Sequence, residues 1–176
     1  MWFLDQLQGS EEYHMPMILK LTGSVDENAL RNALKNILSR HEVLRTVIKS
    51  EKGIGYQEVL PADSWSMEVV TVSEGEDPKA LITAFIEDPF DLSRDYMLRS
   101  RLYRLGDGSH VFANVLHHIA SDGWSNGILT NEFMESYTSL MQRGTCDFPT
   151  LPLQYADYAI WQRTHLEGDV LEGQLS

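Results

Sequence analysis

Residues 111–123, VFANVLHHIASDG, join an apolar run to a short polar motif. The first part, 111–116, is an apolar run of the length and composition of a buried β-strand. The second part brings two histidines, an aspartate and a glycine to the end of that strand. Because side chains alternate along a strand, His117 and His118 are expected to point in opposite directions. The residues in phase with His117 are small or β-branched, which favours packing for His117 and leaves His118 as the candidate for an open cavity.

Strands and helices alternate on both sides of this segment. Strands are expected at 15–21, 44–49, 56–60, 67–72, 97–105 and 110–116, with turns at 53–55 and 106–109. Helices are expected after the caps Asp26 and Asp77, after Gly123, and from about 154 onward. No repeat or linker divides the chain. The fold class is therefore expected to be α/β, with helices on a mixed β-sheet.

Composition narrows the class of protein further. The 176 residues are 43% apolar, enough for one core, and the net charge of −12 argues against nucleic acid or an anionic membrane as partner. No apolar run approaches the roughly 18 residues of a membrane span, and no basic segment precedes one as in a secretory signal. The single Cys146 cannot form an internal disulfide. These features predict a cytoplasmic domain.

Histidines followed by Asp-Gly at the end of a strand suit acyl transfer. A neutral imidazole can accept a proton from an attacking amine or hydroxyl near neutral pH. Asp122 can pair with an arginine and hold the turn, and Gly123 lets the backbone approach a substrate. A structural interpretation, with one histidine buried and one solvated, fits the spacing equally well. A metal site with His118 and Asp122 as ligands lacks a third ligand, so no metal is expected.

The motif and its surroundings resemble a known family. Residues 117–125, HHIASDGWS, resemble the HHxxxDGWS motif of condensation domains in nonribosomal peptide synthetases. Further resemblances follow in the order of that family. Residues 1–4 (MWFL) resemble the end of its first motif, 40–46 (RHEVLRT) its RHExLRT motif, 88–92 (DPFDL) its PFDL segment and 155–161 (YADYAIW) its YxDYAxW motif. Together these motifs extend over nearly the whole chain, which makes the resemblance far more specific than HHxxxDG alone.

Details of the motifs point to one subclass of this family. Trp124 after Asp-Gly argues against the epimerase relatives, and the intact HHxxxD argues against the cyclising relatives. Residues 13–16 (YHMP) and 151–155 (LPLQY) look most like the subclass that joins an L-configured donor to an L-configured acceptor.

The resemblance implies a chloramphenicol-acetyltransferase-like fold of two subdomains with a tunnel between them. Carrier-protein phosphopantetheine arms enter from opposite ends, and no directly bound cofactor is expected. In that picture His118 is the general base or amine-positioning residue, and His117 packs behind the site. Asp122 is structural through an arginine, for which Arg45 is one candidate and a segment absent here another. Gly123 borders the path of the acceptor.

The resemblance also implies an extent and a set of partners. Residues 1–176 are expected to form the N-terminal subdomain, beginning inside the first motif and ending before the second subdomain, and to be inert alone. The implied partners are upstream and downstream peptidyl carrier proteins, the missing C-terminal subdomain, an adjacent adenylation domain and, through an exposed apolar face, a second copy. Two alternatives remain: a coenzyme-A-dependent acyltransferase of the same fold, and a non-catalytic half-domain that docks carriers.

Two other groups have plainer interpretations. Arg40 and His41 follow the first helix, where cations favour the helix dipole. Tyr155, Tyr158 and Trp161 recur at helical spacing, which favours packing over a cofactor site, and the resemblance places them against the missing half.

Overall fold

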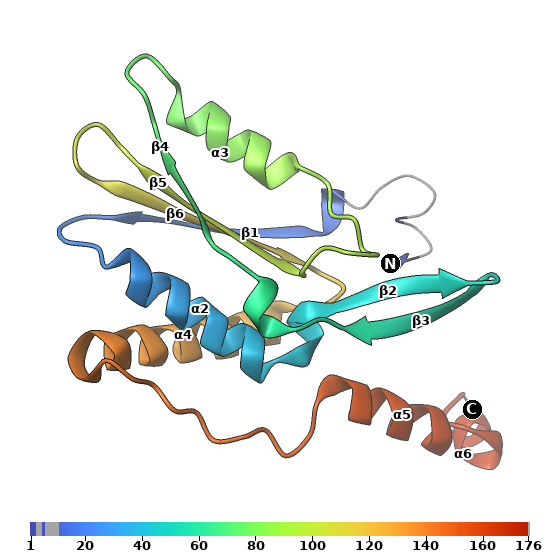
Figure 1. The fold of residues 1–176 in the computed structure, drawn as a ribbon. Coiled ribbons are helices and arrows are strands. Elements are labelled where there is room, and N and C mark those ends of the chain that lie inside the picture. The colour runs from blue at the N-terminus through green and yellow to red at the C-terminus, as the bar shows by residue number, and fades with distance from the viewer. Residues whose placement is uncertain (3–4, 6–10, 176) are drawn as a thin grey trace.

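A four-stranded mixed sheet forms the centre of the molecule (Figure 1). The computed structural model describes residues 1–2, 5 and 11–175, so Phe3 and Leu4 of the first expected motif lie outside it. The strand order is β1-β6-β5-β4. The strands are β1 (His14–Leu21), β4 (Glu68–Thr71), β5 (Leu98–Arg104) and β6 (His110–His117). The β1–β6 and β6–β5 pairs are antiparallel and β4–β5 is parallel, so the sheet is mixed as expected.

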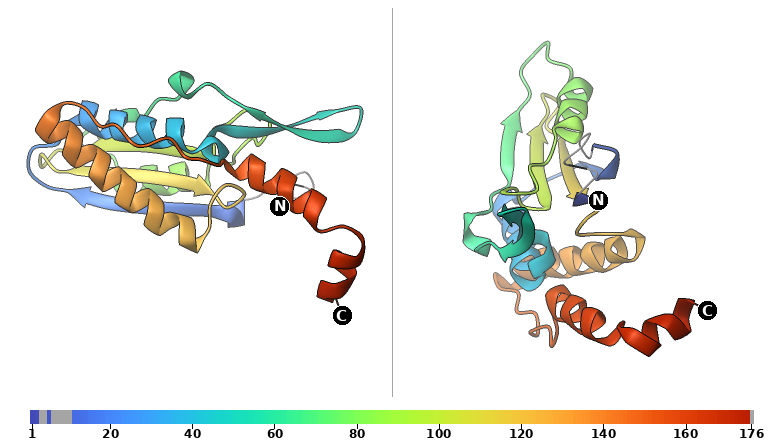
Figure 2. Two further views of the ribbon diagram at one scale, coloured as in Figure 1. Left: turned by 90° about the horizontal axis from the view of Figure 1, so that it is seen from below. Right: turned by 90° about the vertical axis from the view of Figure 1, so that its right-hand side faces the viewer.

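Helices cover both faces of this sheet (Figures 1 and 2). Helix α3 (Pro78–Glu87) lies on one face, and helices α2 (Glu27–Arg40) and α4 (Gly123–Arg143) lie together on the other. Each face has its own apolar cluster. Phe112 and Leu116 belong to the cluster under α2 and α4, whereas Val111, Ala113 and Val115 belong to the cluster under α3. This arrangement confirms the predicted α/β fold class.

The helix starts follow from short-range chemistry. The carboxylate of Asp26 accepts a hydrogen bond from the backbone N–H of Ala29 at 2.9 Å, and Asp77 accepts one from Lys79 at 2.9 Å directly before Pro78. Pro16 lies in β1, an edge strand, where a residue without a backbone N–H is tolerated. These three features agree with the expectations from sequence.

The strands expected at 44–49 and 56–60 lie outside the main sheet. They form a separate hairpin of β2 (Thr46–Glu51) and β3 (Ile54–Val59). The first begins two residues late, because Glu42–Arg45 form a short 3₁₀ helix, η2. The turn is at Lys52 and Gly53, not 53–55. Both have positive φ, 52° and 80°, as the tight turns that fit the strand twist require.

The C-terminal part runs away from the sheet (Figure 2). Helix α5 (Tyr155–His165) occurs as expected, and α6 (Gly168–Leu175) was not expected. Tyr155, Tyr158 and Trp161 pack mainly on one another and on His165, and each ring remains about half exposed. In α4, the apolar residues Ile128 and Met141 are exposed.

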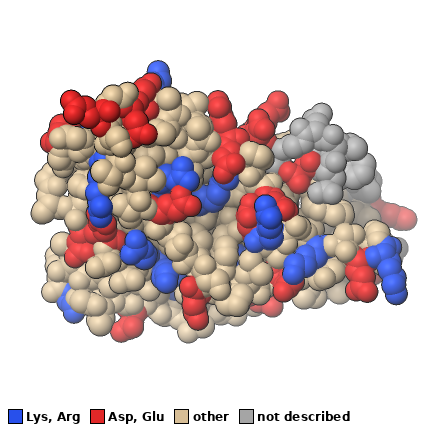
Figure 3. All heavy atoms as spheres, turned by 45° about the horizontal axis from the view of Figure 1, so that its top comes forward, with Lys and Arg blue, Asp and Glu red and all other residues tan. Residues whose placement is uncertain are grey.

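Two short 3₁₀ helices complete the described elements, η1 (Glu11–Tyr13) and η3 (Ala62–Ser64). Basic side chains are interspersed with the more numerous acidic ones on the face that Figure 3 shows. Within the described residues, no helix is both long enough and apolar enough to cross a bilayer.

Candidate active site

Backbone hydrogen bonds fix the end of β6, where the two histidines lie. His117 pairs with His14 in the β1–β6 register, and its backbone N–H donates to the carbonyl of Met97 at 3.0 Å. The backbone N–H of His118 donates to the carbonyl of Tyr13 at 2.9 Å. The histidine pair is therefore held from both sides, by the residue before β1 and by the residue before β5.

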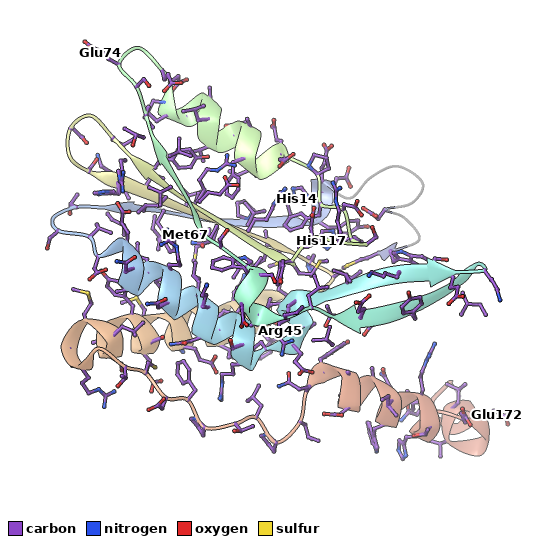
Figure 4. All side chains as sticks on the ribbon, viewed as in Figure 1. His14, Arg45, Met67, Glu74, His117 and Glu172 are labelled. Atoms are coloured by element: carbon purple, nitrogen blue, oxygen red, sulfur yellow. The ribbon has the colours of Figure 1, made fainter. Side chains whose placement is uncertain are left out.

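The imidazole of His117 is fully buried, with 0% of the residue exposed. Its Nδ1 accepts a hydrogen bond from the backbone N–H of Ile119 at 3.0 Å, so the neutral ring carries its proton on Nε2. The ring meets Phe90 edge-on at 5.4 Å between centroids, and His14 lies at 6.1 Å (Figure 4). Burial, followed by repulsion from His14, lowers the pKa of His117 from 6.5 to about 4. At neutral pH His117 is an uncharged brace for the turn.

The side chain of His118 is exposed, in contrast to its neighbour. The reason differs from the one the sequence suggested. The residues in phase with His118, Asn114 and Leu116, are themselves buried, so alternation along the strand does not explain why His118 is exposed. His118 is accessible because β6 ends at His117 and the chain turns away there.

Asp122 forms the N-cap of α4. Its Oδ1 accepts hydrogen bonds from the backbone N–H of Ser125 at 2.8 Å and from the Ser125 hydroxyl at 2.6 Å. These two bonds, the hydroxyl first, lower the pKa of Asp122, and nearby His118 adds a smaller effect. The carboxylate is thus stabilised by a helix cap.

The suggested Asp122–Arg45 pair is wrong for the described part of the chain, where no ion pair joins the two residues. Arg45 instead donates from Nε to the carbonyl of Leu38 at 3.0 Å and from Nη1 to that of Leu60 at 2.7 Å. It also pairs with Glu42 at 3.2 Å. Arg45 therefore ties the end of α2 to the residue after β3 (Figure 4). Its guanidinium is already committed to these acceptors, which explains why it does not reach the turn.

Gly123 is the first residue of α4. A Cβ atom at this position would meet nothing within 4 Å, and its φ lies outside the positive region. Neither packing nor backbone strain requires glycine here. The open space in front of Gly123 leaves room for a group to approach the start of α4 beside His118.

A polar cluster that the sequence did not indicate joins α2, α4 and α5. Glu132 of α4 accepts from His41 at 2.6 Å and from Arg40 Nε at 3.0 Å. The side-chain amide of Gln154 donates to the carbonyl of Arg40 at 2.9 Å and accepts from the backbone N–H of Glu42 at 3.1 Å. Arg40 and His41 thus clamp α4 and the start of α5, rather than only facing the dipole of α2.

A hollow of about 140 Å³ adjoins the turn that follows β6. Ile119 and Ala120 of the turn form one wall, and Thr46 of the hairpin and Tyr155 of α5 line it elsewhere. The turn, the hairpin and the first residue of α5 therefore meet at one place, although Thr46 and Tyr155 are more than 100 positions apart in the chain. Over the described part of the chain, no group of three His, Cys, Asp or Glu side chains is arranged to hold a metal ion.

The structure thus combines a mixed sheet with the HHxxxDG sequence at the end of β6. The family model of the condensation domain matches residues 1–175, so the chain belongs to the condensation domain family.

Similar proteins agree with this assignment. The chain is 42% identical to a linear gramicidin synthase of Brevibacillus parabrevis over 100% of its length, and 36% identical to malpinin synthetase of Mortierella alpina over 99%. It spans only 2% of each of these proteins. The crystal structure of the X-domain from teicoplanin biosynthesis superimposes with a TM-score of 0.81 at 29% identity, covering 99% of this chain and 37% of that one. The structures confirm the chloramphenicol-acetyltransferase-like fold.

Proposed function

We propose that this chain is part of a nonribosomal peptide synthetase condensation domain that joins a carrier-bound acyl thioester to a carrier-bound amine. Membership of the family and the similarity to named peptide synthetases support the reaction class. The observation that carries the assignment to a site is the contrast at the end of β6. There a buried, neutral His117 braces the turn and an exposed His118 is left free to meet a substrate.

The reaction requires one imidazole and a defined position of the amine relative to the thioester. The amine nitrogen of the acceptor attacks the thioester carbonyl carbon of the donor, and a C–N bond forms. His118 accepts the proton that the amine loses, or holds the amine in line for attack. The C–S bond then breaks, and the departing sulfur takes up a proton to become the free thiol of a phosphopantetheine arm. One amide and one thiol result from one thioester and one amine.

The neighbouring residues act through His118. His117 supports the turn from inside, and Asp122 starts α4 directly behind it. Gly123 leaves the approach open, and Arg45 keeps η2 and the hairpin in place beside the turn. We assign these four residues to positioning and structure, and only His118 to contact with the reacting atoms.

The partners follow from the same proposal. Substrates arrive on the phosphopantetheine arms of upstream and downstream carrier proteins, and an adenylation domain lies nearby in a cytoplasmic synthetase. Residues 1–176 act as the N-terminal subdomain, and a second subdomain supplies the other wall of the tunnel. The half-exposed rings of Tyr155, Tyr158 and Trp161 offer an apolar face for that subdomain or, in its absence, for a second copy. Alone, the chain is expected to lack activity because nothing holds both arms together.

The test is amide formation from two loaded carriers, followed by mass analysis of the product. The domain completed with its second subdomain is expected to yield the amide on the acceptor carrier, and the 176-residue chain is expected to yield none. Amide formation from an acyl-coenzyme A, with carrier thioesters unused, would favour the acyltransferase alternative. Product from the monomeric 176-residue chain would contradict the division into two subdomains.

A docking function is a second candidate that one comparison favours. The X-domain from teicoplanin biosynthesis, in its complex with OxyB, is 31% identical to this chain with a TM-score of 0.79. A domain of this fold can therefore serve as a platform for another protein. Carrier binding without amide product in the completed domain would select this function over catalysis.

A further inference from the structure

A second hollow, of about 220 Å³, lies on the opposite side of β6 from His117, between the sheet and α4. Its inner walls are apolar and largely buried, and they come from β5, β6, α2 and α4. These wall residues are Leu34, Ile37, Leu98, Leu116, Leu129 and Phe133. Exposed residues of β1 and α4, Pro16, Asn126 and Thr130, form the rim. The hollow is therefore an apolar pocket. Its rim of exposed residues lies between the edge strand and the first turns of α4.

One polar side chain interrupts the apolar wall. Asn114 is only 2% exposed, and its Oδ1 accepts a hydrogen bond from the Ser100 hydroxyl at 2.7 Å. The amide nitrogen, Nδ2, is buried, and no hydrogen-bond acceptor for it exists among the described residues. A buried donor without an acceptor is rare and costs stability, so an asparagine kept here needs another explanation.

Leu116, which lines the hollow, stands two positions before His118 in the chain. Asn114 and Leu116 occupy alternate positions on β6, and His118 continues this series just past the end of the strand. Positions two apart on a strand are separated by about 7 Å. Asp122 caps the same helix, α4, that covers the hollow. A group bound near His118 could therefore extend a tail along β6 and under the first turns of α4.

We propose that this hollow is a subsite for the side chain or acyl tail of one of the two substrates, and that Asn114 selects a tail that carries a hydrogen-bond acceptor. The assignment to a substrate rests on the proposed function, whereas the binding preference rests on the hollow itself. Its volume of about 220 Å³ exceeds the roughly 150 Å³ of an apolar cavity known to take benzene. A phenyl-sized group with a few further atoms, including one carbonyl or ether oxygen, fits this space.

The first experiment compares two probes of nearly equal shape on the 176-residue chain. Acetophenone carries a carbonyl oxygen where cumene carries a methyl group. Binding is followed by methyl NMR shifts of Leu116 and Leu129, on the inner wall. Both probes are expected to shift these methyls, and acetophenone is expected to bind about 5-fold more tightly or better, because it alone satisfies Asn114 Nδ2. Equal affinities, or no shift at these two residues, would overturn the proposal.

Variants identify the group responsible. Asn114→Leu is expected to abolish the preference for acetophenone, and Leu129→Trp is expected to fill the hollow and weaken both probes at least 10-fold. Met134→Ala, on the exposed side of the same helix, serves as the matched control and leaves both affinities unchanged. Because Asn114→Leu can impair folding, each variant is first checked for a cooperative melt, and Leu129→Trp keeps the test decisive. Unchanged affinities in Leu129→Trp would place the probes elsewhere.

A second experiment identifies the substrate that uses the subsite. The 4-acetylphenylalanine side chain is presented either as an N-acetylated N-acetylcysteamine thioester, which mimics the donor, or as a free-amine amide, which mimics the acceptor. The 4-isopropylphenylalanine pair is the matched control. Tighter binding of one acetyl form identifies the donor or the acceptor, and binding of neither overturns the proposal. The preference for acetophenone over cumene is measured without any reaction at His118, so a failure of the proposed chemistry and a failure of the subsite can be told apart.

Discussion

Strand β6 and the turn that follows it are neighbours in the chain but differ in almost every physical property. The strand is buried from Val111 to His117, and its last residue, His117, is neutral and bonded within the turn. The turn, residues 118–123, exposes His118, Asp122 and Gly123. The next residue, Trp124, is 89% exposed despite its large apolar ring. The strand therefore holds residues that fix the fold, and the turn holds residues that can meet a partner.

The largest effect is expected from a substitution in the buried strand. Phe112 is 0% exposed and stacks on Phe133 at 5.6 Å between ring centroids. Phe112→Ala is expected to lower the free energy of unfolding by about 3–5 kcal/mol, because it removes buried area and leaves a cavity. Trp124→Ala removes an even larger ring from the exposed side and is expected to change it by less than about 0.5 kcal/mol. Urea unfolding of both variants measures the contrast, and similar losses would contradict it.

A second prediction separates the two histidines by pH. His117 has a folded-state pKa of about 4 against 6.5 when unfolded, so the unfolded chain binds a proton that the folded chain does not. Its contribution to stability is therefore full above about pH 6.5 and is lost progressively as the pH falls toward 4, by up to about 3 kcal/mol.

His117→Asn tests this linkage, because the asparagine carbonyl can still accept from Ile119 but does not titrate. The free energy of unfolding is measured by urea titration between pH 7 and pH 4. The variant is expected to lose less stability than the wild type across this range. The exposed neighbour gives the control, since His118→Asn should leave the wild-type acid dependence in place. An identical acid loss in wild type and His117→Asn would contradict the burial argument.

A smaller effect is expected at the cap of α4. Asp122→Ala removes two hydrogen bonds to Ser125 and should lower the melting temperature at pH 7 by on the order of a few degrees. The pKa of Asp122 is lowered in the folded state, so the carboxylate stabilises the fold above its unfolded pKa of 3.8 and loses this effect as the pH falls through the folded value. The gap between wild type and variant should narrow as the pH falls below 3.8. A gap that persists there would point to a role other than capping.

Much of the fold was predictable because it depends on short-range patterns. Caps at Asp26 and Asp77 set two helix starts, Pro16 indicated an edge strand, and the apolar run at 111–116 indicated β6. The order of strands and the separate hairpin were not predictable in the same way. The periodicity of β2 and β3 shows that they are strands, but it carries no information about which strands they pair with.

The candidate site was also predictable only where it depends on short-range patterns. The burial of His117 follows from alternation along β6, whereas His118 is exposed because the strand ends at His117. The cap at Asp122 follows from its place before a helix. The clamp of Glu132 on Arg40 and His41 joins residues about 90 positions apart, and Arg45 finds its acceptors in the carbonyls of Leu38 and Leu60. Backbone carbonyls leave no signal in the sequence, so the acceptors of Arg45 could not be predicted. Arg45 was one candidate partner of Asp122 through the family resemblance alone.

We expect His118, and not His117, to meet the reacting groups. The direct test is the single-turnover rate of amide formation from two loaded carriers, measured in the completed domain for wild type, His118→Ala and His117→Asn. His118→Ala is expected to slow the step by about 10²–10⁴-fold with carrier affinity unchanged, the usual contribution of a general base. His117→Asn is expected to stay within a few-fold of the wild type at pH 7.5. A wild-type rate in His118→Ala, or a larger loss in His117→Asn, would contradict the account.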